Sequence, residues 1–209
     1  GTIEIPFDVA HLESELRLVR AAGIDSVAIA FLHAYAFPQH ERLAVQVARS
    51  IGFAQISTSH EISPLIRILP RADTTVADAY LTPVLRRYID RVAGKLGARR
   101  TRDAPKLHFM TSAGGLTSAD TFRGRDAILS GPAGGVVAMA QTARRAGFDR
   151  VIGFDMGGTS TDVAHFAGTY ERTLETHIAG VRLATPMLNI HTVAAGGGSI
   201  LTFDGTRLR

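Results

Sequence analysis

The stretch VIGFDMGGTSTDVAHF, residues 151–166, places two glycines and three hydroxyl side chains between two apolar segments. If residues 151–155 and 160–166 are neighbouring strands, Gly157 and Gly158 occupy the tight turn between them. Glycine tolerates backbone conformations that other residues avoid, and it lets backbone N–H groups face a bound anion. The motif therefore predicts a fold in which two neighbouring strands are joined by a tight glycine turn.

The side chains around the turn suit phosphate and a divalent cation. Thr159, Ser160 and Thr161 place hydroxyls within contact range of a phosphate. Asp155, at the end of the first predicted strand, could hold the hydration shell of Mg²⁺, because that ion keeps several waters and uses few carboxylates. An ordinary hairpin whose Asp and Thr side chains bond to their own backbone is the alternative.

Two further glycine clusters favour the phosphate interpretation. SGPAGG, residues 130–135, opens a predicted helix and contains Gly131 and Gly134, while AAGGGS, residues 194–199, follows a predicted strand. Anions bind readily where backbone N–H groups are exposed at such ends. Three clusters of this kind predict a nucleotide cleft, with close helix packing as the alternative for SGPAGG. In AAGGGS, the glycines expected to bind the cofactor are Gly196, Gly197 and Gly198.

The order of predicted elements indicates an α/β fold. Helical patterns at residues 7–23, 39–53 and 72–96 alternate with predicted strands at 26–35 and 54–59, a further strand at 106–115 precedes a helix from Ser130 to Gly147, and the chain then turns to strands with a hairpin signal at Asp204 and Gly205. Asp8 and Ser130 are the expected helix caps, and Gly23 and Gly52 the expected helix ends.

The pattern also predicts an irregularity in the long helix and a boundary between two domains. Pro83 should kink the long helix or divide it near Thr82. Because strands replace helices after Gly147, we expect a domain boundary there, between 1–147 and 148–209.

Composition narrows the class of protein. The 209 residues contain no cysteine, which excludes disulfides and thiolate metal sites and suits a cytoplasmic location. The apolar runs are far below the roughly 18 to 20 residues that span a bilayer, so no membrane contact is expected. The net charge of +4 allows a nucleic-acid-binding domain, but the arginines fall on predicted helix faces without interleaved aromatics. We expect no nucleic-acid partner.

The longer pattern resembles a known family. ILSGPAGGVVAMAQTARRAGFDRVIGFDMGGTSTDVA resembles the linking helix and second phosphate hairpin of the actin-like ATPase superfamily, which has a ribonuclease-H-like fold. With ADAYLTPVLRRYI, SAGGL and HTVAAGGGSILTFDG, the chain is similar to the hydantoinase A, acetone carboxylase and 5-oxoprolinase family, and most similar to its 5-oxoprolinases. The resemblance covers essentially the whole chain.

The resemblance implies a fragment that covers the end of one ribonuclease-H-like domain and the start of the second. It implies ATP and Mg²⁺ as cofactors, with Gly157, Gly158 and the Thr159 backbone on the β- and γ-phosphates, Asp155 at the magnesium ion or positioning the nucleophile, and Asp162 holding the N–H groups of the turn. The first phosphate hairpin of the family is absent from these residues. We therefore expect the chain alone not to bind ATP tightly.

The implied reaction is ATP-dependent hydrolysis of a cyclic amide, 5-oxo-L-proline, to glutamate in glutathione metabolism. The implied partners are a small lactam or cyclic ureide and the remainder of the protein or a hydantoinase B-type subunit, in an oligomer. A hydantoinase A or acetone carboxylase-type subunit and an actin- or chaperone-like ATP switch are the alternatives. His191, just before AAGGGS, is the histidine candidate for a metal ligand, with a structural role as its alternative.

Overall fold

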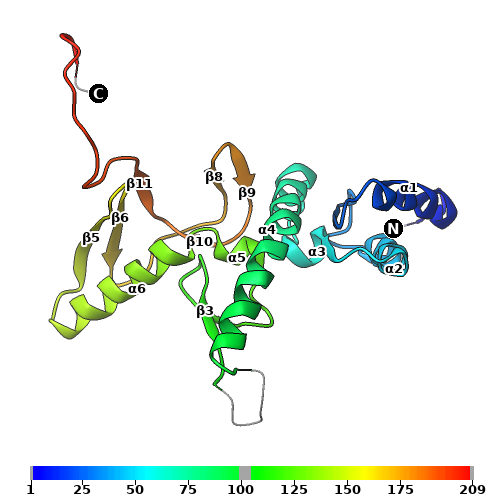
Figure 1. Cartoon of the computed structure of the whole chain (residues 1–209), viewed down its shortest axis with the longest axis horizontal. Coiled ribbons are helices and arrows are strands. Elements are labelled where there is room, and N and C mark those ends of the chain that lie inside the picture. Colours follow the sequence, from blue (N-terminus) through cyan, green and yellow to red (C-terminus); the bar gives the residue numbers. More distant parts are fainter. Residues whose placement is uncertain (1, 99–104, 208–209) are drawn as a thin grey trace. The chain divides into compact units, whose positions relative to one another are not determined.

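The computed structural model describes residues 2–98 and 105–207 of the chain, with helices and strands labelled in Figure 1. Its contacts divide it into two compact units. Unit 1 comprises Gly1–Phe109, Thr117–Ile128 and Leu174–Pro186, and unit 2 comprises Met110–Leu116, Leu129–Thr173 and Met187–Arg209. The mixed α/β fold class is confirmed. The units follow no single cut along the chain.

The first helices of unit 1 begin and end at the signals in the sequence. Helix α1 spans Val9–Ala21, and the Oδ1 atom of its N-cap, Asp8, accepts a hydrogen bond of 2.9 Å from the N–H of His11. Helix α2 spans Gln39–Ile51 and ends at Gly52, whose φ of 93° places it in the left-handed region that glycine tolerates. Both helix predictions are therefore confirmed.

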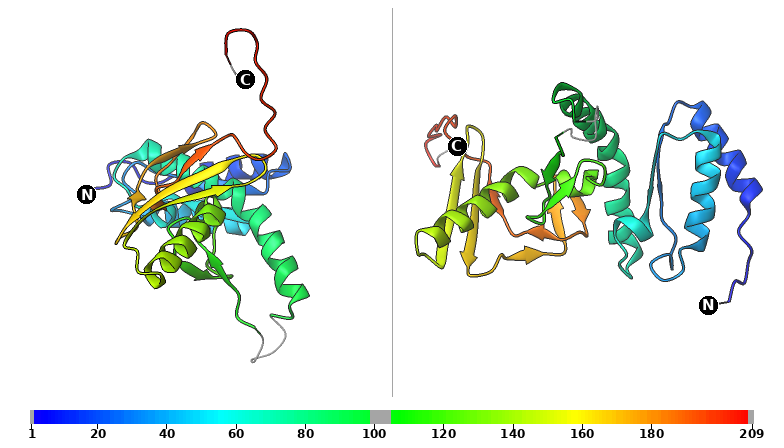
Figure 2. Two further views of the ribbon diagram at one scale, coloured as in Figure 1. Left: turned by 90° about the vertical axis from the view of Figure 1, so that its left-hand side faces the viewer. Right: turned by 90° about the horizontal axis from the view of Figure 1, so that it is seen from below.

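Two parallel strands form the centre of unit 1. β1 (Ser26–Ile29) pairs with β2 (Gln55–Thr58), and the pair lies between α2 on one side and the long helix α4 (Ile68–Lys95) on the other (Figure 2). β1 is shorter than expected. The reason is that the carbonyl groups just beyond it are hydrogen-bonded by the guanidinium of Arg71 and not by a neighbouring strand.

Helix α4 continues through Pro83, so of the two outcomes expected there, a kink or a division near Thr82, division does not occur. A proline cannot donate a hydrogen bond to the carbonyl four residues earlier, which here belongs to Ala79. The hydroxyl of Ser26 donates to that carbonyl oxygen at 2.9 Å instead. A side chain from β1 thus replaces the missing bond, and sequence-local reasoning cannot foresee it.

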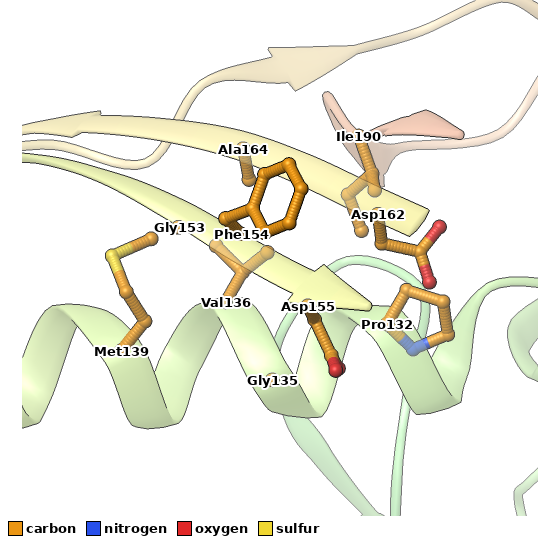
Figure 3. Close-up of a pocket in the computed structure, with 10 residues that line it drawn as sticks. All are labelled: Pro132, Gly135, Val136, Met139, Gly153, Phe154, Asp155, Asp162, Ala164 and Ile190. Atoms are coloured by element: carbon orange, nitrogen blue, oxygen red, sulfur yellow. The ribbon is translucent and has the colours of Figure 1, made fainter. Parts of the chain in front are cut away.

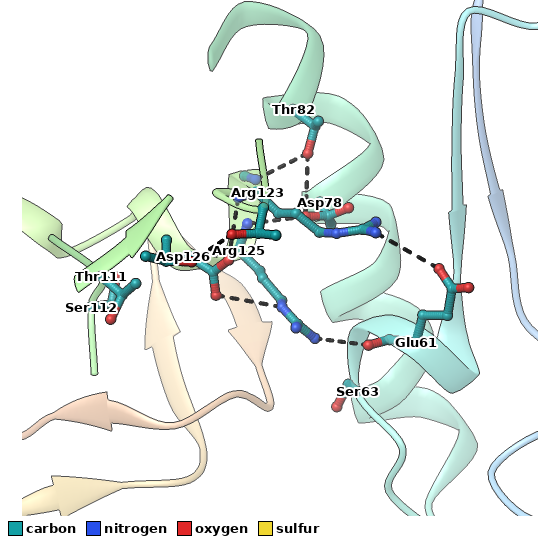
Figure 4. A network of polar contacts seen from close by, with 12 residues as sticks. Glu61, Ser63, Asp78, Thr82, Thr111, Ser112, Arg123, Arg125 and Asp126 are labelled. Carbon is teal, nitrogen blue, oxygen red and sulfur yellow. Dashed lines mark hydrogen bonds and ion pairs between the residues drawn. The ribbon is translucent and has the colours of Figure 1, made fainter. Parts of the chain in front are cut away.

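A polar cluster fastens the short helix α5 (Gly124–Ala127) to α4 (Figure 4). The N–H of Gly124 donates to Thr82 Oγ1 at 3.0 Å, and the N–H of Arg125 donates to Asp78 Oδ1 at 3.1 Å. The other oxygen of Asp78 accepts from Ser57 Oγ, at 2.7 Å, so this carboxylate also contacts β2. The rest of unit 1 includes α3 (Ser59–Ile62) and the hairpin of β8 (Thr176–Ile178) and β9 (Val181–Leu183).

Unit 2 is a small sheet with one helix packed on it. The sheet has the order β11-β6-β5 and is antiparallel throughout, and α6 packs on β5 and β6. Short pairs lie beside it, β7 with β10 in unit 2 and β3 with β4 where the chain passes between the units. The bounds are α6 Ser130–Arg145, β5 Arg150–Met156, β6 Thr161–Ala167, β7 Arg172–Thr173, β10 Met187–Leu188, β11 His191–Val193, β3 His108–Met110 and β4 Leu116–Ser118.

The core of unit 2 depends on small residues that let α6 approach the sheet. Ala133 and Val136 of α6 pack with Ala164 of β6 and with Leu188. A Cβ atom at Gly153 of β5 would lie 3.1 Å from the Cε of Met139, so a side chain there would require Met139 to shift. The helix therefore packs closely on β5.

Two local expectations in unit 2 need correction. Ser130 is the first residue of α6 and not its cap; the cap position belongs to Leu129, whose N–H donates to Ser112 Oγ at 2.9 Å. Asp204 and Gly205 form a turn, in which Asp204 Oδ1 accepts from the N–H groups of two following residues, but no pair of strands flanks it in the described residues. None of the described helices has the length and apolar character needed to cross a membrane.

Candidate phosphate-binding site

The turn between β5 and β6 presents three unused backbone donors. The N–H of Gly157 donates to Ser160 O at 2.9 Å and closes the turn. The N–H groups of Gly158, Thr159 and Ser160 have no hydrogen-bond partner among residues 2–98 and 105–207. Consecutive free N–H groups at an exposed turn form an anion-binding concavity. The predicted turn therefore forms, and it has the donors that a phosphate requires.

The AAGGGS loop lies directly against this turn. The N–H groups of Gly197 and Gly198 donate to the carbonyl oxygens of Gly157 and Gly158 at 2.9 and 2.8 Å. Gly196 approaches so closely that a Cβ atom there would lie 2.6 to 2.7 Å from backbone atoms of residues 157–159. The loop thus fixes the turn, while its own three glycine N–H groups are already bonded within the protein.

Two aspartates lie opposite each other on neighbouring strands at the base of the turn. Asp155 and Asp162 are direct partners in the β5–β6 register, so their side chains share one face of the sheet. Among the described residues neither forms an ion pair, and like charges opposite each other are unfavourable without a cation. The resemblance implied that Asp162 holds the N–H groups of the turn, but its carboxylate accepts none of them. Its Oδ1 accepts instead from the hydroxyl of Thr192 at 2.6 Å.

A pocket of about 240 Å³ opens beside these carboxylates (Figure 3). Its walls come from α6 and from the sheet, and both carboxylates lie at the end near Pro132. The lining residues are Pro132, Gly135, Val136, Met139, Gly153, Phe154, Asp155, Asp162, Ala164 and Ile190. The wall is mostly apolar, so charge is concentrated at the end that carries the two aspartates.

The glycines of SGPAGG divide between the two roles considered for them. A Cβ atom at Gly134 would lie 3.8 Å from Met110 Cγ, and one at Gly131 would meet no atom within 4 Å. Gly135 faces the site, because a Cβ there would lie 3.6 Å from Asp155 Oδ2. The helical period reveals this: positions 132, 135, 136 and 139 all line the pocket. Gly135 was therefore missed although the sequence held the signal for it.

His191 lies on the other face of the sheet. It pairs with Val163, the neighbour of Asp162 along β6, and successive strand residues point to opposite faces. The structure therefore does not bring His191 to the two carboxylates, and the next residue, Thr192, takes that place. His191 lines a second pocket with His165 and Glu171, where the hydrogen bond from His165 lowers the pKa of Glu171 below its usual value.

The donor set matches the group it was predicted to hold. Free N–H groups suit phosphate oxygens, and two opposed carboxylates suit a Mg²⁺ ion that keeps most of its waters. Among the described residues no group of three or more His, Asp or Glu side chains could hold a metal ion. The turn with its free N–H groups and the two neighbouring aspartates therefore form the candidate site, with room for at most a cation that keeps most of its waters.

Comparison with known proteins identifies the family of the chain. Residues 71–209 match the family model described as hydantoinase/oxoprolinase, and residues 1–52 match that of its N-terminal region. The chain therefore belongs to the hydantoinase/oxoprolinase family. It is 48% identical to a 5-oxoprolinase of Saccharomyces cerevisiae over 97% of this chain and 16% of that protein. It thus spans about a sixth of the length of such a relative.

Two solved structures resemble the fold closely. An acetone carboxylase in nucleotide-free form matches with a TM-score of 0.82 and 25% identity over 100% of this chain and 30% of that one. An ATP-dependent caprolactamase from Pseudomonas jessenii matches with a TM-score of 0.81 and 34% identity over 99% of this chain and 30% of that one. The family resemblance expected from the motifs is confirmed.

Proposed function

We propose that the chain is the part of an ATP-dependent cyclic amide hydrolase that binds the phosphates of ATP, and that the substrate of the complete enzyme is 5-oxo-L-proline. The observation that carries this proposal is the β5–β6 turn with its three free N–H groups beside two opposed carboxylates. The relatives named 5-oxoprolinase support the choice of substrate. The products are L-glutamate, ADP and phosphate.

The chemical difficulty of this reaction is the resonance-stabilised ring amide. Phosphorylation of the carbonyl oxygen turns that oxygen into part of a leaving group, after which water can open the ring. The protein contributes positioning and charge neutralisation to the phosphoryl step. The N–H groups of Gly158, Thr159 and Ser160 bind the β- and γ-phosphates, and the turn keeps its shape because the AAGGGS loop is bonded to it.

The two carboxylates would hold a Mg²⁺ ion through its waters, and the ion would neutralise charge on the phosphates. Asp155 lies beside Gly135, where the absent side chain leaves its carboxylate accessible. Asp162 is held in one orientation by the hydroxyl of Thr192, which makes Thr192 a positioning residue.

We also propose the domain arrangement that the resemblance implies. Residues 1–147 form the end of one ribonuclease-H-like domain, and 148–209 form the start of the next. Support comes from the glycine hairpin followed by a third antiparallel strand and preceded by a helix. The complete protein, in the cytoplasm and as an oligomer, supplies the remaining phosphate contacts and a hydantoinase B-type domain or subunit.

The test is ADP release by the complete protein with Mg²⁺ and, in turn, 5-oxoproline, N-methylhydantoin, caprolactam, or acetone with bicarbonate. We expect 5-oxoproline to stimulate release and Asp155→Ala to lower the stimulated rate by roughly 10² to 10³-fold, as for loss of one strong electrostatic contact. Asp149→Ala, an exposed aspartate just before β5, is the matched control and should leave the rate unchanged.

Other outcomes point to defined alternatives. Stimulation by a different substrate would assign the enzyme to the hydantoinase, caprolactamase or acetone carboxylase type. If ATP binds and no substrate raises turnover, the hydrolase proposal is wrong and an ATP switch is favoured.

A further inference from the structure

The pocket beside Asp155 and Asp162 has an apolar part that phosphate binding does not explain. Its volume is about 240 Å³, and all its lining residues belong to unit 2. Figure 3 shows the two aspartates at one end of the pocket and Met139 at the other. Phosphates and a hydrated cation are polar, so they account for the aspartate end and for the free N–H groups of the turn. They assign no ligand to the apolar end.

Side chains from α6 and from the sheet side form the apolar wall. Val136 and Met139 of α6 line it, together with Ala164 and Ile190. All four also pack in or against the hydrophobic core cluster of unit 2. Among the lining residues, which all belong to the described part of the chain, only the two aspartates carry a charge. The pocket therefore combines an apolar inner end with an acidic mouth.

Small residues in the wall do not close this space. Small residues where a helix meets a sheet normally let the two elements pack tightly. Gly153 does so, since a Cβ atom there would lie 3.1 Å from Met139 Cε. At Gly135 the nearest atom to an added Cβ would be Asp155 Oδ2 at 3.6 Å, which is an ordinary contact distance. Glycine is less favourable than alanine within a helix, and no tight packing at Gly135 offsets that cost. Its missing side chain instead leaves the acidic end open.

A small lactam ring has the same division between polar and apolar atoms. The ring holds the amide bond cis, so the N–H and C=O groups point to one side and the ring methylenes form the other. When the methylenes contact the apolar wall, both polar groups are directed to the acidic end, where a carboxylate can accept the N–H. An apolar cavity of about 150 Å³ can hold a benzene ring. The volume of about 240 Å³ therefore has room for a substituted five-membered ring.

We propose that this pocket binds the ring of the cyclic amide and that Met139 sets the ring size that the enzyme accepts. The inference rests on the function proposed above and adds the place where the substrate lies. The ring methylenes contact Val136, Met139 and Ile190. The ring N–H donates to Asp155, because Asp162 already accepts from Thr192. The carbonyl oxygen is directed to the γ-phosphate at the turn.

The structure of 5-oxo-L-proline agrees with this orientation. Its carboxylate is attached to the carbon next to the ring nitrogen, so it stays at the mouth of the pocket and outside the apolar part. The inner end contacts only methylenes. It therefore discriminates between substrates by the size of the ring and not by their charge, and Met139 is the residue at that end (Figure 3).

The adenine ring of ATP is the other group that an apolar pocket could bind. The position of the pocket favours the lactam. The pocket adjoins the aspartates and the turn to which the β- and γ-phosphates are assigned, and adenine lies at the opposite end of the nucleotide. An adenine site would make the KM for ATP depend on Met139, whereas a lactam site would make the choice of lactam depend on it.

The test is the ring-size preference of Met139→Ala in the complete protein. The substrates are 5-oxoproline and its six-membered homologue, 6-oxopiperidine-2-carboxylate, which has one more ring methylene. Alanine removes the thioether end of the side chain and leaves space for that methylene. We expect kcat/KM for the homologue, relative to kcat/KM for 5-oxoproline, to rise by about 10-fold or more, as one methylene in an apolar pocket changes such a ratio. The KM for ATP should stay unchanged.

Met139→Leu is the matched control. Exchange of Met for Leu nearly conserves side-chain volume, so the ratio should stay within about twofold of the wild-type ratio. Both substrates are assayed on one preparation of each variant. Partial unfolding of a variant therefore lowers both rates equally and leaves the ratio unchanged, which separates a change of specificity from a loss of stability.

Each other outcome refutes a defined statement. An unchanged ratio in Met139→Ala would overturn the inference, and an unchanged ratio with a raised KM for ATP would assign the pocket to the nucleotide. If 5-oxoproline stimulates the wild type and the ratio is the same in all three proteins, the proposed function stands and only the ring site is wrong. If no cyclic amide stimulates ADP release by the wild type, the proposed function fails and the ring site fails with it.

Discussion

Replacing Gly196 by alanine tests whether the AAGGGS loop holds the phosphate turn in place. The new Cβ would lie 2.6 Å from Gly157 O, 2.7 Å from Gly158 C and 2.7 Å from Thr159 N. Comfortable contacts are about 3.5 to 4.0 Å, so loop and turn must separate by about 1 Å. All three clashing atoms are backbone, and no rotamer change can relieve the contact.

Two effects lower the stability of the Gly196→Ala variant. Overpacking of this kind typically costs about 1 to 3 kcal/mol of stability. The separation also breaks or lengthens the hydrogen bonds from Gly197 and Gly198 to the turn, each worth about 1 kcal/mol. A displacement of about 1 Å at a reacting group can lower the rate by about 100-fold. We therefore expect kcat/KM for ATP to fall at least 10-fold in the complete enzyme.

The assay is ADP release under 5-oxoproline stimulation, with thermal unfolding measured in parallel. Gly94→Ala in α4 is the control, because a Cβ there meets no atom within 4 Å. It should leave activity unchanged and stability equal or slightly raised. Wild-type kcat/KM in Gly196→Ala would show that the loop does not position the turn, and the reasoning from the close contacts would be wrong.

Three further predictions concern the phosphate site and the buried carboxylate of Glu41. Gly158→Ala should weaken ATP binding in calorimetry without lowering the unfolding temperature, since a Cβ at Gly158 meets no protein atom within 4 Å and only a ligand could clash with it. Thr192→Val should lower kcat through the freed Asp162 carboxylate while Thr192→Ser retains it; equal rates would exclude a positioning role. Burial raises the pKa of Glu41, but the hydrogen bonds that its carboxylate accepts outweigh burial and bring the pKa below its usual value. The stability that these bonds contribute is therefore complete above about pH 4.3 and is lost as the pH falls through the folded-state pKa. Glu41→Gln should flatten this acid-side loss in urea titrations.

The elements that the sequence predicts well are those with a local cause. Asp8 caps α1 and Gly52 ends α2 because each depends only on its neighbours along the chain, and the glycines of residues 157–158 mark the β5–β6 turn through their backbone freedom. Where a distant group intervenes, local reasoning fails. Ser26 supports α4 at Pro83 from another element, and Ser112 accepts the N–H of Leu129, which holds the cap position expected of Ser130.

The candidate sites follow the same rule. The phosphate turn and Asp155 could be predicted, and the periods of helix and strand would have added Gly135 and Thr192. The buried contacts of Ser59 with Glu41 and Arg71 form a network that could not be predicted in this way. It joins residues 41, 59 and 71 from three helices, and no spacing in the sequence indicates that these side chains meet.

Groups without hydrogen-bond partners distinguish the β5–β6 turn from the buried polar cluster around Asp78. The carboxylate of Asp78 is fully buried, yet its oxygens accept from Ser57, Thr82 and the N–H of Arg125. It needs nothing further, and a structural role accounts for it. The β5–β6 turn instead leaves three donors free beside two carboxylates that are direct partners across the strands, and one phosphorylated ligand with a cation would satisfy both sets of groups.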